Sequence, residues 1–135
     1  MKDSKNIVYL LKNKTVNNLP NMIIAVDFDG TIVKHKYPAI GKELPFAIKT
    51  LILLQQKGHK IILWTYRFGK ELEEAIHFCE KRGLTFYAVN NGFEGEEFNN
   101  TYSRKIYADV YIDDRNLLGI PEWGKIYELI IEKEK

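Results

Sequence analysis

The sequence has little cysteine, no long apolar run and little net charge. Its single cysteine, Cys79, cannot form a disulfide within the chain. A lone thiol is typical of reducing compartments, so we expect a cytoplasmic protein. No apolar stretch approaches the roughly 20 residues of a membrane span, which argues against a membrane protein. A formal net charge of +2 on 135 residues does not favour nucleic acid as a partner.

A length of 135 residues predicts one domain, preceded here by a short extension. Residues 1–20 carry four lysines and one aspartate, and an Asn- and Pro-containing stretch ends them. We expect this extension either to pack on the body or to be flexible. Residues 21–135 carry the regular pattern of strands and helices, so they form the single predicted catalytic domain.

Apolar runs and helical spacings alternate along residues 21–135. Strands are predicted at 23–26, 60–65, 84–89 and 108–112, because short apolar runs lie there between turn residues. Helices are predicted from Pro45 to Gly58, over 72–79 before Gly83, and from Pro121 onward. Repeated strand–helix units predict an α/β fold, with a three-layer Rossmann-like parallel sheet and helices on both of its faces.

Two aspartates, Asp27 and Asp29, directly follow the first predicted strand. Aspartate is a poor strand former, and like charges held close together repel unless a cation joins them. Other polar groups lie at or near the carboxyl ends of later strands, where ligands of parallel sheets bind. These groups are Thr65, Lys105, Asp113 and Asp114. Carboxylates suit Mg²⁺, whereas a hydroxyl and an ammonium suit phosphate oxygens.

The motif Asp27-Phe28-Asp29-Gly30-Thr31, followed in order by Thr65, Lys105 and Asp113-Asp114, resembles the haloacid dehalogenase-like phosphohydrolase superfamily. The region after residue 21 is similar to small capless members of it. The resemblance implies that Asp27 attacks phosphorus and becomes an aspartyl phosphate. It implies that Asp29 protonates the leaving oxygen and then activates water.

The resemblance also implies a Mg²⁺ site and a phosphate site. The ion would bind the Asp27 carboxylate, the Asp29 backbone carbonyl and Asp113, with Asp114 nearby. Thr65 and Lys105 would contact the phosphoryl group. Lys105 lies only eight positions before Asp113, which is short for the family.

The segments at which larger relatives insert a cap domain, 31–43 and 90–102, are too short for a separate core. We therefore expect no cap and an open site, with a phosphorylated small molecule or macromolecule as substrate. The 90–102 loop could set specificity, and the chain leaves an oligomer open. Arg67 is interpreted either as a substrate contact or as a solvated helix start. The three histidines, at positions 35, 59 and 77, are interpreted as surface or boundary residues.

The predicted activity is Mg²⁺-dependent phosphomonoester hydrolysis with an unspecified substrate. One alternative is a 5′-(deoxy)nucleotidase-like activity, because Asp113-Asp114-Arg115 also ends a motif of related deoxyribonucleotidases. Another is a non-catalytic phosphate-binding or receiver-like module. Receivers carry the phosphorylated aspartate in mid-chain, whereas here the candidate nucleophile is on the first strand.

Overall fold

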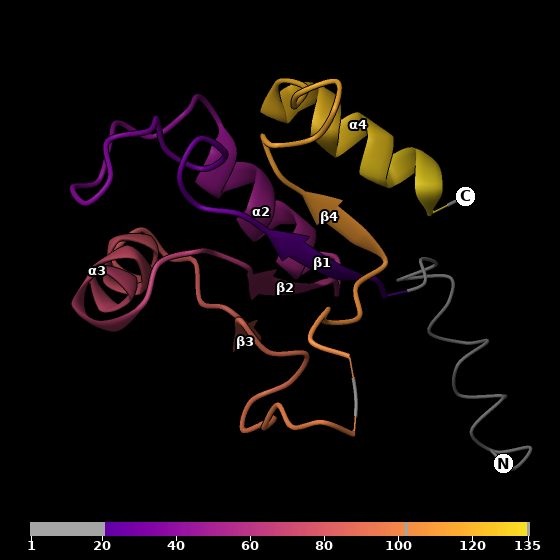
Figure 1. Ribbon diagram of the computed structural model, residues 1–135. Coiled ribbons are helices and arrows are strands. Elements are labelled where there is room, and N and C mark those ends of the chain that lie inside the picture. The colour runs from indigo at the N-terminus through magenta and orange to yellow at the C-terminus, as the bar shows by residue number, and fades with distance from the viewer. Residues whose placement is uncertain (1–20, 102, 135) are drawn as a thin grey trace, which may run out of the picture.

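A computed structural model describes residues 21–101 and 103–134, so the 1–20 extension lies outside the described residues. Its centre is a four-stranded parallel sheet in the order β3-β2-β1-β4. The strands are β1 (Ile23–Val26), β2 (Lys60–Leu63), β3 (Ala88–Val89) and β4 (Val110–Ile112). In Figure 1 the strands run the same way, and the loops after β1 and β4 leave at one edge. We call this the carboxyl edge.

One helix follows each of β1, β2 and β4 in the sequence. These helices are α2 (Ala47–Gln56), α3 (Gly69–Glu80) and α4 (Trp123–Lys133). Each buries a face spaced by three or four residues, as the sequence predicts. The α2 helix buries Ala47, Ile48, Leu51 and Leu54. The α3 helix buries Ala75 and Cys79, and α4 buries Trp123, Ile126 and Ile130. None of the helices among the described residues is long and apolar enough to cross a membrane.

The alternation of side chains along the strands divides the sheet into two faces. Ile24 and Val26 of β1, with Ile61 and Leu63 of β2, belong to the large buried cluster that also contains the side chains of all three helices. The α/β parallel-sheet prediction is therefore confirmed, and no cap domain interrupts the described residues.

The opposite face of the sheet differs from the predicted helical layer. Here Ala25, Ile62 and Ala88 pack with Ile106 and the partly buried Tyr111. Ile106 lies in the connection between β3 and β4, which has no helix among its described residues. This connection lacks the apolar repeat of a helix, so it covers the face with single side chains instead.

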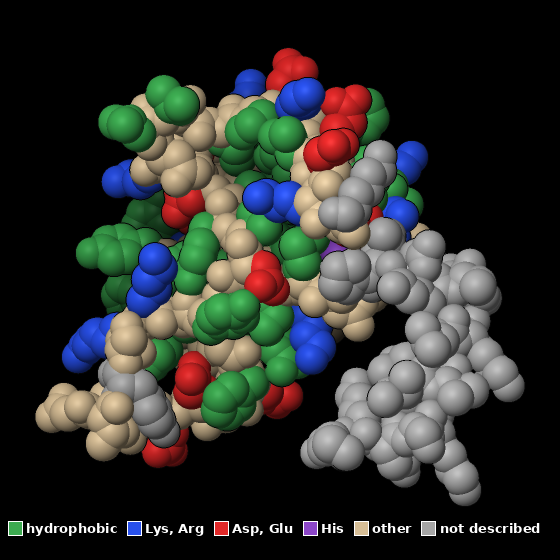
Figure 2. Space-filling model, turned by 90° about the vertical axis from the view of Figure 1, so that its right-hand side faces the viewer, with side chains coloured by type: hydrophobic (Ala, Val, Ile, Leu, Met, Phe, Trp, Pro, Cys, Tyr) green, Lys and Arg blue, Asp and Glu red, His purple; other side chains and the backbone are tan. Residues whose placement is uncertain are grey.

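Basic and acidic side chains are interspersed with apolar ones on the side of the molecule in Figure 2. This side is turned away from the loops that leave the carboxyl edge in Figure 1. The polar residues that follow the strands lie at the carboxyl edge, away from this side.

Candidate active site at the carboxyl edge

Three carboxylates meet where β1 and β4 end side by side. Val26 of β1 pairs in register with Ile112 of β4, and the Asp27 N–H donates to the Ile112 carbonyl over 2.9 Å. The residues that follow the two strands are therefore neighbours. Oxygens of Asp27, Asp113 and Asp114 all lie within 4.8 Å of one another, which is close enough to hold one metal ion. We call these three residues the acidic cluster.

A tight turn after β1 places a hydroxyl inside the acidic cluster. The N–H groups of Thr31 and Ile32 donate to the Phe28 carbonyl. The buried Thr31 hydroxyl lies 2.9 Å from Asp27 Oδ2 and 3.3 Å from Asp114 Oδ1, and it accepts the Asp114 N–H over 3.0 Å. Thr31 therefore links the β1 turn directly to the end of β4.

Glycine is required at the position just before Thr31 in this turn. Gly30 has φ +85°, and a Cβ there would collide with the side chains of Asp114 and His35. Gly30 is therefore needed both for the left-handed backbone conformation and for the close approach of the Asp114 side chain.

The crowding of carboxylates changes their acidity. Burial, together with the nearby charge of Asp113, raises the pKa of Asp27 from 3.8 to about 7. Burial also acts to raise the pKa of Asp114, but hydrogen bonds from His35 and Asp27 outweigh it and hold that pKa below its usual value. The cluster therefore carries negative charge that a cation would stabilise. Its all-oxygen donor set fits Mg²⁺.

The second aspartate of the motif is bound to an arginine. Arg67 Nε donates to Asp29 Oδ2 over 2.7 Å, and Nη2 donates to Oδ1 over 2.8 Å. The Arg67 side chain is only 1% exposed and that of Asp29 is 14% exposed. This bidentate pair holds the Asp29 carboxylate against Arg67, and Asp29 is not a member of the acidic cluster.

All five N–H donors of the Arg67 guanidinium have partners within the protein. Besides the two bonds to Asp29, Nη1 donates to the carbonyls of Pro38 and Glu71, and Nη2 donates to the carbonyl of Ala39. The guanidinium also lies about 5 Å from the ring centre of Phe28. Arg67 is thus neither a solvated helix start nor, in this structure, a free substrate contact.

The predicted phosphate ligands lie in different places. Thr65 follows β2 at the carboxyl edge, with its N–H bound to Asn90 Oδ1 over 2.8 Å and its hydroxyl bound to the Arg67 N–H over 3.1 Å. Lys105 is exposed, and its ammonium lies 5.1 Å from the ring centre of Tyr111. The structure therefore brings Thr65 to the edge but does not bring the Lys105 ammonium to the acidic cluster.

Comparison with known proteins gives one clear relative. No family model and no curated protein matches the chain. The solved structure of a conserved protein from Bacteroides thetaiotaomicron is 57% identical in sequence, with a TM-score of 0.80. The match covers 86% of this chain and 94% of that one. The chain belongs to the same family as this conserved protein.

Two residues of this family member join the site although sequence reasoning did not assign them to it. His35 Nε2 lies 3.0 Å from Asp114 Oδ2, although 79 positions separate the two residues. Asn90 holds the Thr65 backbone from the end of β3. The signal for Asn90 was its position after a strand, as for the aspartates. Nothing in the sequence distinguished His35 from the other histidines.

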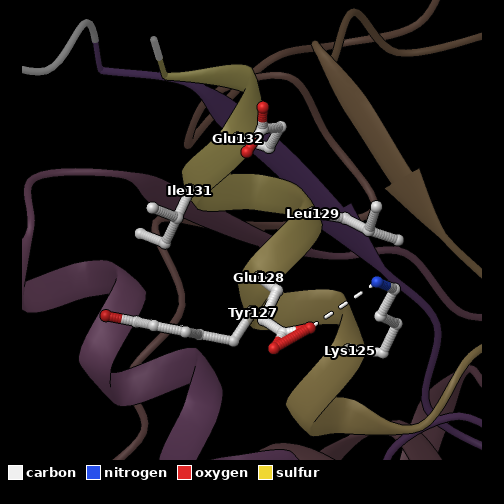
Figure 3. Close-up of a pocket in the computed structure, with 6 residues that line it drawn as sticks. All are labelled: Lys125, Tyr127, Glu128, Leu129, Ile131 and Glu132. Atoms are coloured by element: carbon white, nitrogen blue, oxygen red, sulfur yellow. Dashed lines mark ion pairs between the residues drawn. The ribbon is translucent and has the colours of Figure 1, made fainter.

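A surface hollow of about 490 Å³ lies elsewhere in this family member. All six residues that line it belong to α4, as Figure 3 shows, and Lys125 and Glu128 form an ion pair beside it over 3.6 Å. None of the six belongs to the acidic cluster or to the Asp29–Arg67 pair. The hollow is therefore separate from the acidic cluster at the carboxyl edge.

Proposed function

We propose that the protein is a Mg²⁺-dependent phosphomonoester hydrolase of the haloacid dehalogenase-like type that works through an aspartyl phosphate on Asp27. The observation that carries this proposal is the convergence of Asp27, Asp113 and Asp114 within 4.8 Å at the carboxyl edge. The order and types of the motif residues support the same proposal, because the nucleophile, the hydroxyl and the acidic pair follow β1, β2 and β4.

The acidic cluster would hold the metal ion. Without a cation, burial and Asp113 raise the pKa of Asp27 to about 7, so protons and cations compete for this carboxylate. Bound Mg²⁺ would supply positive charge that offsets the carboxylates and the phosphoryl oxygens. Its ligands would be oxygens of Asp27, Asp113 and Asp114, with the Asp29 backbone carbonyl as a further donor.

The residues around the cluster would divide the remaining tasks. Hydrogen bonds of its N–H to Ile112 and of its carboxylate to Thr31 fix Asp27, which orients one carboxylate oxygen for attack on phosphorus. The Thr65 hydroxyl, at the end of the neighbouring strand, would bind a phosphoryl oxygen. Asp29 would protonate the leaving oxygen and then activate the attacking water. The Lys105 ammonium would have to leave the Tyr111 ring to reach a phosphate at this edge.

Hydrolysis of 4-nitrophenyl phosphate by the purified full-length chain tests the proposal. We expect turnover in Mg²⁺, loss of turnover in EDTA, and its return when Mg²⁺ is added back. Asp27→Asn should reduce kcat at least about a thousandfold, because the amide cannot form the acyl phosphate. Mass spectrometry of acid-quenched wild-type enzyme should show a phosphorylated Asp27.

Glu128→Gln is the matched control for the removal of a carboxylate, since Glu128 is exposed on α4. It should keep wild-type turnover. Turnover that survives Asp27→Asn unchanged would contradict the nucleophile assignment. Binding of Mg²⁺ and phosphate with no turnover of any phosphate compound would favour the non-catalytic module instead.

A further inference from the structure

A hydrogen-bonded turn after β4 presents two leucines to solvent. The Gly119 N–H donates to the Asn116 carbonyl over 2.9 Å, so Leu117 and Leu118 are the two central residues of the turn. Their exposed fractions are 101% and 98%. Central positions of turns are usually taken by Gly, Pro, Asn, Asp or Ser. Two leucines at the tip of an ordered turn therefore indicate a surface that contacts a partner.

A second exposed apolar pair follows β2. Tyr66 is 102% exposed and Phe68 is 72% exposed, whereas Arg67 between them is 1% exposed. This alternation places both rings on the outer side of the chain. The bond from the Thr65 N–H to Asn90 and the bond from the Arg67 N–H to the Thr65 hydroxyl hold the backbone on both sides of Tyr66. The two rings are therefore exposed by an anchored segment of backbone.

Two contacts make these pairs neighbours of the 34–37 loop. His35 Nε2 lies 3.0 Å from Asp114 Oδ2, directly before the turn that carries the leucines. The Tyr37 ring centre lies 5.0 Å from the guanidinium of Arg67, which separates the two exposed rings in sequence. Segments that follow three different strands thus meet around the acidic cluster.

These three segments combine exposed apolar side chains with positive charge. We call residues 34–37, 66–70 and 115–118 the rim. The rim contains no acidic residue. Besides Arg67, whose charge is offset by Asp29, it has exposed basic residues on every segment. These residues are Lys34, Lys36, Lys70 and Arg115.

The loop after β3 is not part of the rim. It carries Glu94, Glu96 and Glu97, and in Figure 1 it runs below the sheet, away from the 31–43 loop. The acidic cluster lies beside the rim, and its negative charge is the charge that Mg²⁺ would offset. The rim is therefore the positively charged part of the carboxyl edge.

The chemistry of the rim distinguishes one kind of partner from three others. Small molecules bind in concave pockets, whose walls are not made of fully exposed side chains. Protein interfaces are depleted in lysine, whereas three of the four exposed basic residues here are lysines. Bases of nucleic acids stack on aromatic rings, which leaves the two leucines without a role. A lipid surface accepts both leucine and aromatic side chains, and its anionic headgroups attract lysine.

We propose that the rim docks on an anionic lipid surface. The exposed leucines and aromatic rings would enter the boundary between headgroups and acyl chains, and the lysines would lie against the headgroups. None of the described helices can cross a membrane, so the protein lies on this surface and does not span it. Docking brings the acidic cluster to the level of the lipid headgroups.

Co-sedimentation with lipid vesicles tests this inference. The full-length chain is mixed with vesicles of phosphatidylcholine alone, or of phosphatidylcholine with about 30% phosphatidylserine, and we expect at least about tenfold tighter binding to the anionic vesicles. Raising NaCl from about 0.1 M to about 1 M should weaken this binding, because the screening length falls from about 10 Å to about 3 Å. Equal binding to both kinds of vesicle, or to neither, would overturn the inference.

Variants of the rim separate its effect from that of residues 1–20, which carry four lysines. Lys34→Glu/Lys36→Glu should weaken binding to the anionic vesicles at least about twentyfold, since each basic residue near such a surface contributes about fivefold. Leu117→Ser/Leu118→Ser should weaken it at least about tenfold through lost apolar burial. Circular dichroism should show both variants folded, because the replaced side chains are exposed.

Matched control variants change the same residue types away from the rim. Lys81→Glu/Lys133→Glu replaces two exposed lysines at the ends of α3 and α4, and Leu129→Ser replaces a leucine that is 43% exposed on α4. Both should bind vesicles as the wild type does. If instead the rim variants bind as the wild type does, vesicle binding belongs to residues 1–20 and the inference is wrong.

Two further measurements test the other occupants of this surface. Binding of a labelled oligodeoxythymidine in place of vesicles would identify a nucleic acid and overturn the inference. So would a dimer, detected by light scattering, that Leu117→Ser/Leu118→Ser dissociates while vesicles stay unbound. Hydrolysis of 4-nitrophenyl phosphate without vesicle binding would remove only this inference, whereas vesicle binding without hydrolysis of any phosphate compound would remove only the proposed function.

Discussion

At the scale of single residues, Arg67 has the densest set of polar contacts around the candidate site. One guanidinium joins the turn after β1, the 37–39 loop and the first turn of α3. These are contacts across 28 to 38 positions of sequence and one across four. Arg67 therefore acts on the shape of the carboxyl edge as well as on the charge of Asp29.

Replacement of Arg67 by Met tests its structural contribution. The change leaves Asp29 without its counter-charge and three carbonyls without donors, so we expect a loss of about 3–5 kcal/mol in the free energy of unfolding. Urea denaturation followed by circular dichroism measures this loss. Arg104→Met is the control, since Arg104 is exposed. That variant should stay within about 0.5 kcal/mol of the wild type, and a similar loss in both variants would contradict the assignment.

The raised pKa of Asp27 predicts a pH dependence of stability in the metal-free protein. Burial and Asp113 raise this pKa from 3.8 to about 7, so the folded state keeps a proton that the unfolded state has released. The stabilisation by that proton is complete below pH 3.8 and is lost as the pH rises to about 7. Asp27→Asn removes this carboxyl group, so the variant lacks this pH dependence.

In EDTA, the Tm of Asp27→Asn should therefore rise relative to that of the wild type between roughly pH 5 and pH 7. Above this range the difference in Tm should level off, because Asp27 is then ionised in both the folded and the unfolded wild type. Thermal melts at several pH values measure it. Mg²⁺ should raise the Tm of the wild type more than that of the variant, because it binds the charged carboxylate. A difference in Tm that is independent of pH would contradict the raised pKa.

At the scale of elements, α4 is attached to the site through its first residue. The Trp123 indole N–H donates to the Thr31 carbonyl over 2.9 Å in a buried contact. Thr31 in turn contacts both Asp27 and Asp114. The packing of the last helix is thus linked by one residue to the acidic cluster.

Trp123→Phe should weaken this link while it keeps an aromatic ring in the core. The Thr31 carbonyl loses a buried donor, so we expect the free energy of unfolding to fall by about 1–3 kcal/mol. Mg²⁺ affinity, measured by calorimetry, should fall about tenfold, since a residue behind the ligands moves. Tyr127→Phe on the same helix is the control. Unchanged Mg²⁺ affinity in Trp123→Phe would show that α4 stabilises the fold without acting on the cluster.

The features that depend on residues close together in the sequence were predictable from it. The buried faces of α2 and α4 follow the apolar spacing, and Asp27 and Asp113 are adjacent because parallel strands end at one edge. The burial of Arg67 was not predictable, because its partners become neighbours only after folding. The same holds for His35 and Asp114. The helical layer expected on the second face is absent from the described residues, since Ile106 and Tyr111 cover that face without a helix.

At the scale of the whole molecule, one edge of the sheet carries the candidate active site and the other carries a structural contact. The candidate catalytic residues lie at the carboxyl edge. At the opposite edge, where the strands begin, a buried histidine holds three segments together. His59 Nδ1 accepts the Met22 N–H over 3.0 Å, so Nε2 carries the ring proton and donates to Glu134. One ring therefore joins the approach to β1, the start of β2 and the end of α4. It also corrects the interpretation of His59 as a surface or boundary residue, because its side chain is fully buried.

Glu134→Ala separates stability from catalysis at this scale. Loss of a buried hydrogen bond to a charged group should lower the free energy of unfolding by about 1.5–3 kcal/mol. Because the pair lies at the edge opposite the acidic cluster, kcat and Mg²⁺ affinity should stay within about twofold of the wild type at temperatures where the variant is folded. Chemical denaturation and the phosphatase assay measure the two quantities on one preparation. Glu132→Ala, an exposed carboxylate on the same helix, should change neither. A loss of kcat in Glu134→Ala without a loss of stability would mean that the two edges are coupled, because such a change cannot arise from the His59 contact alone.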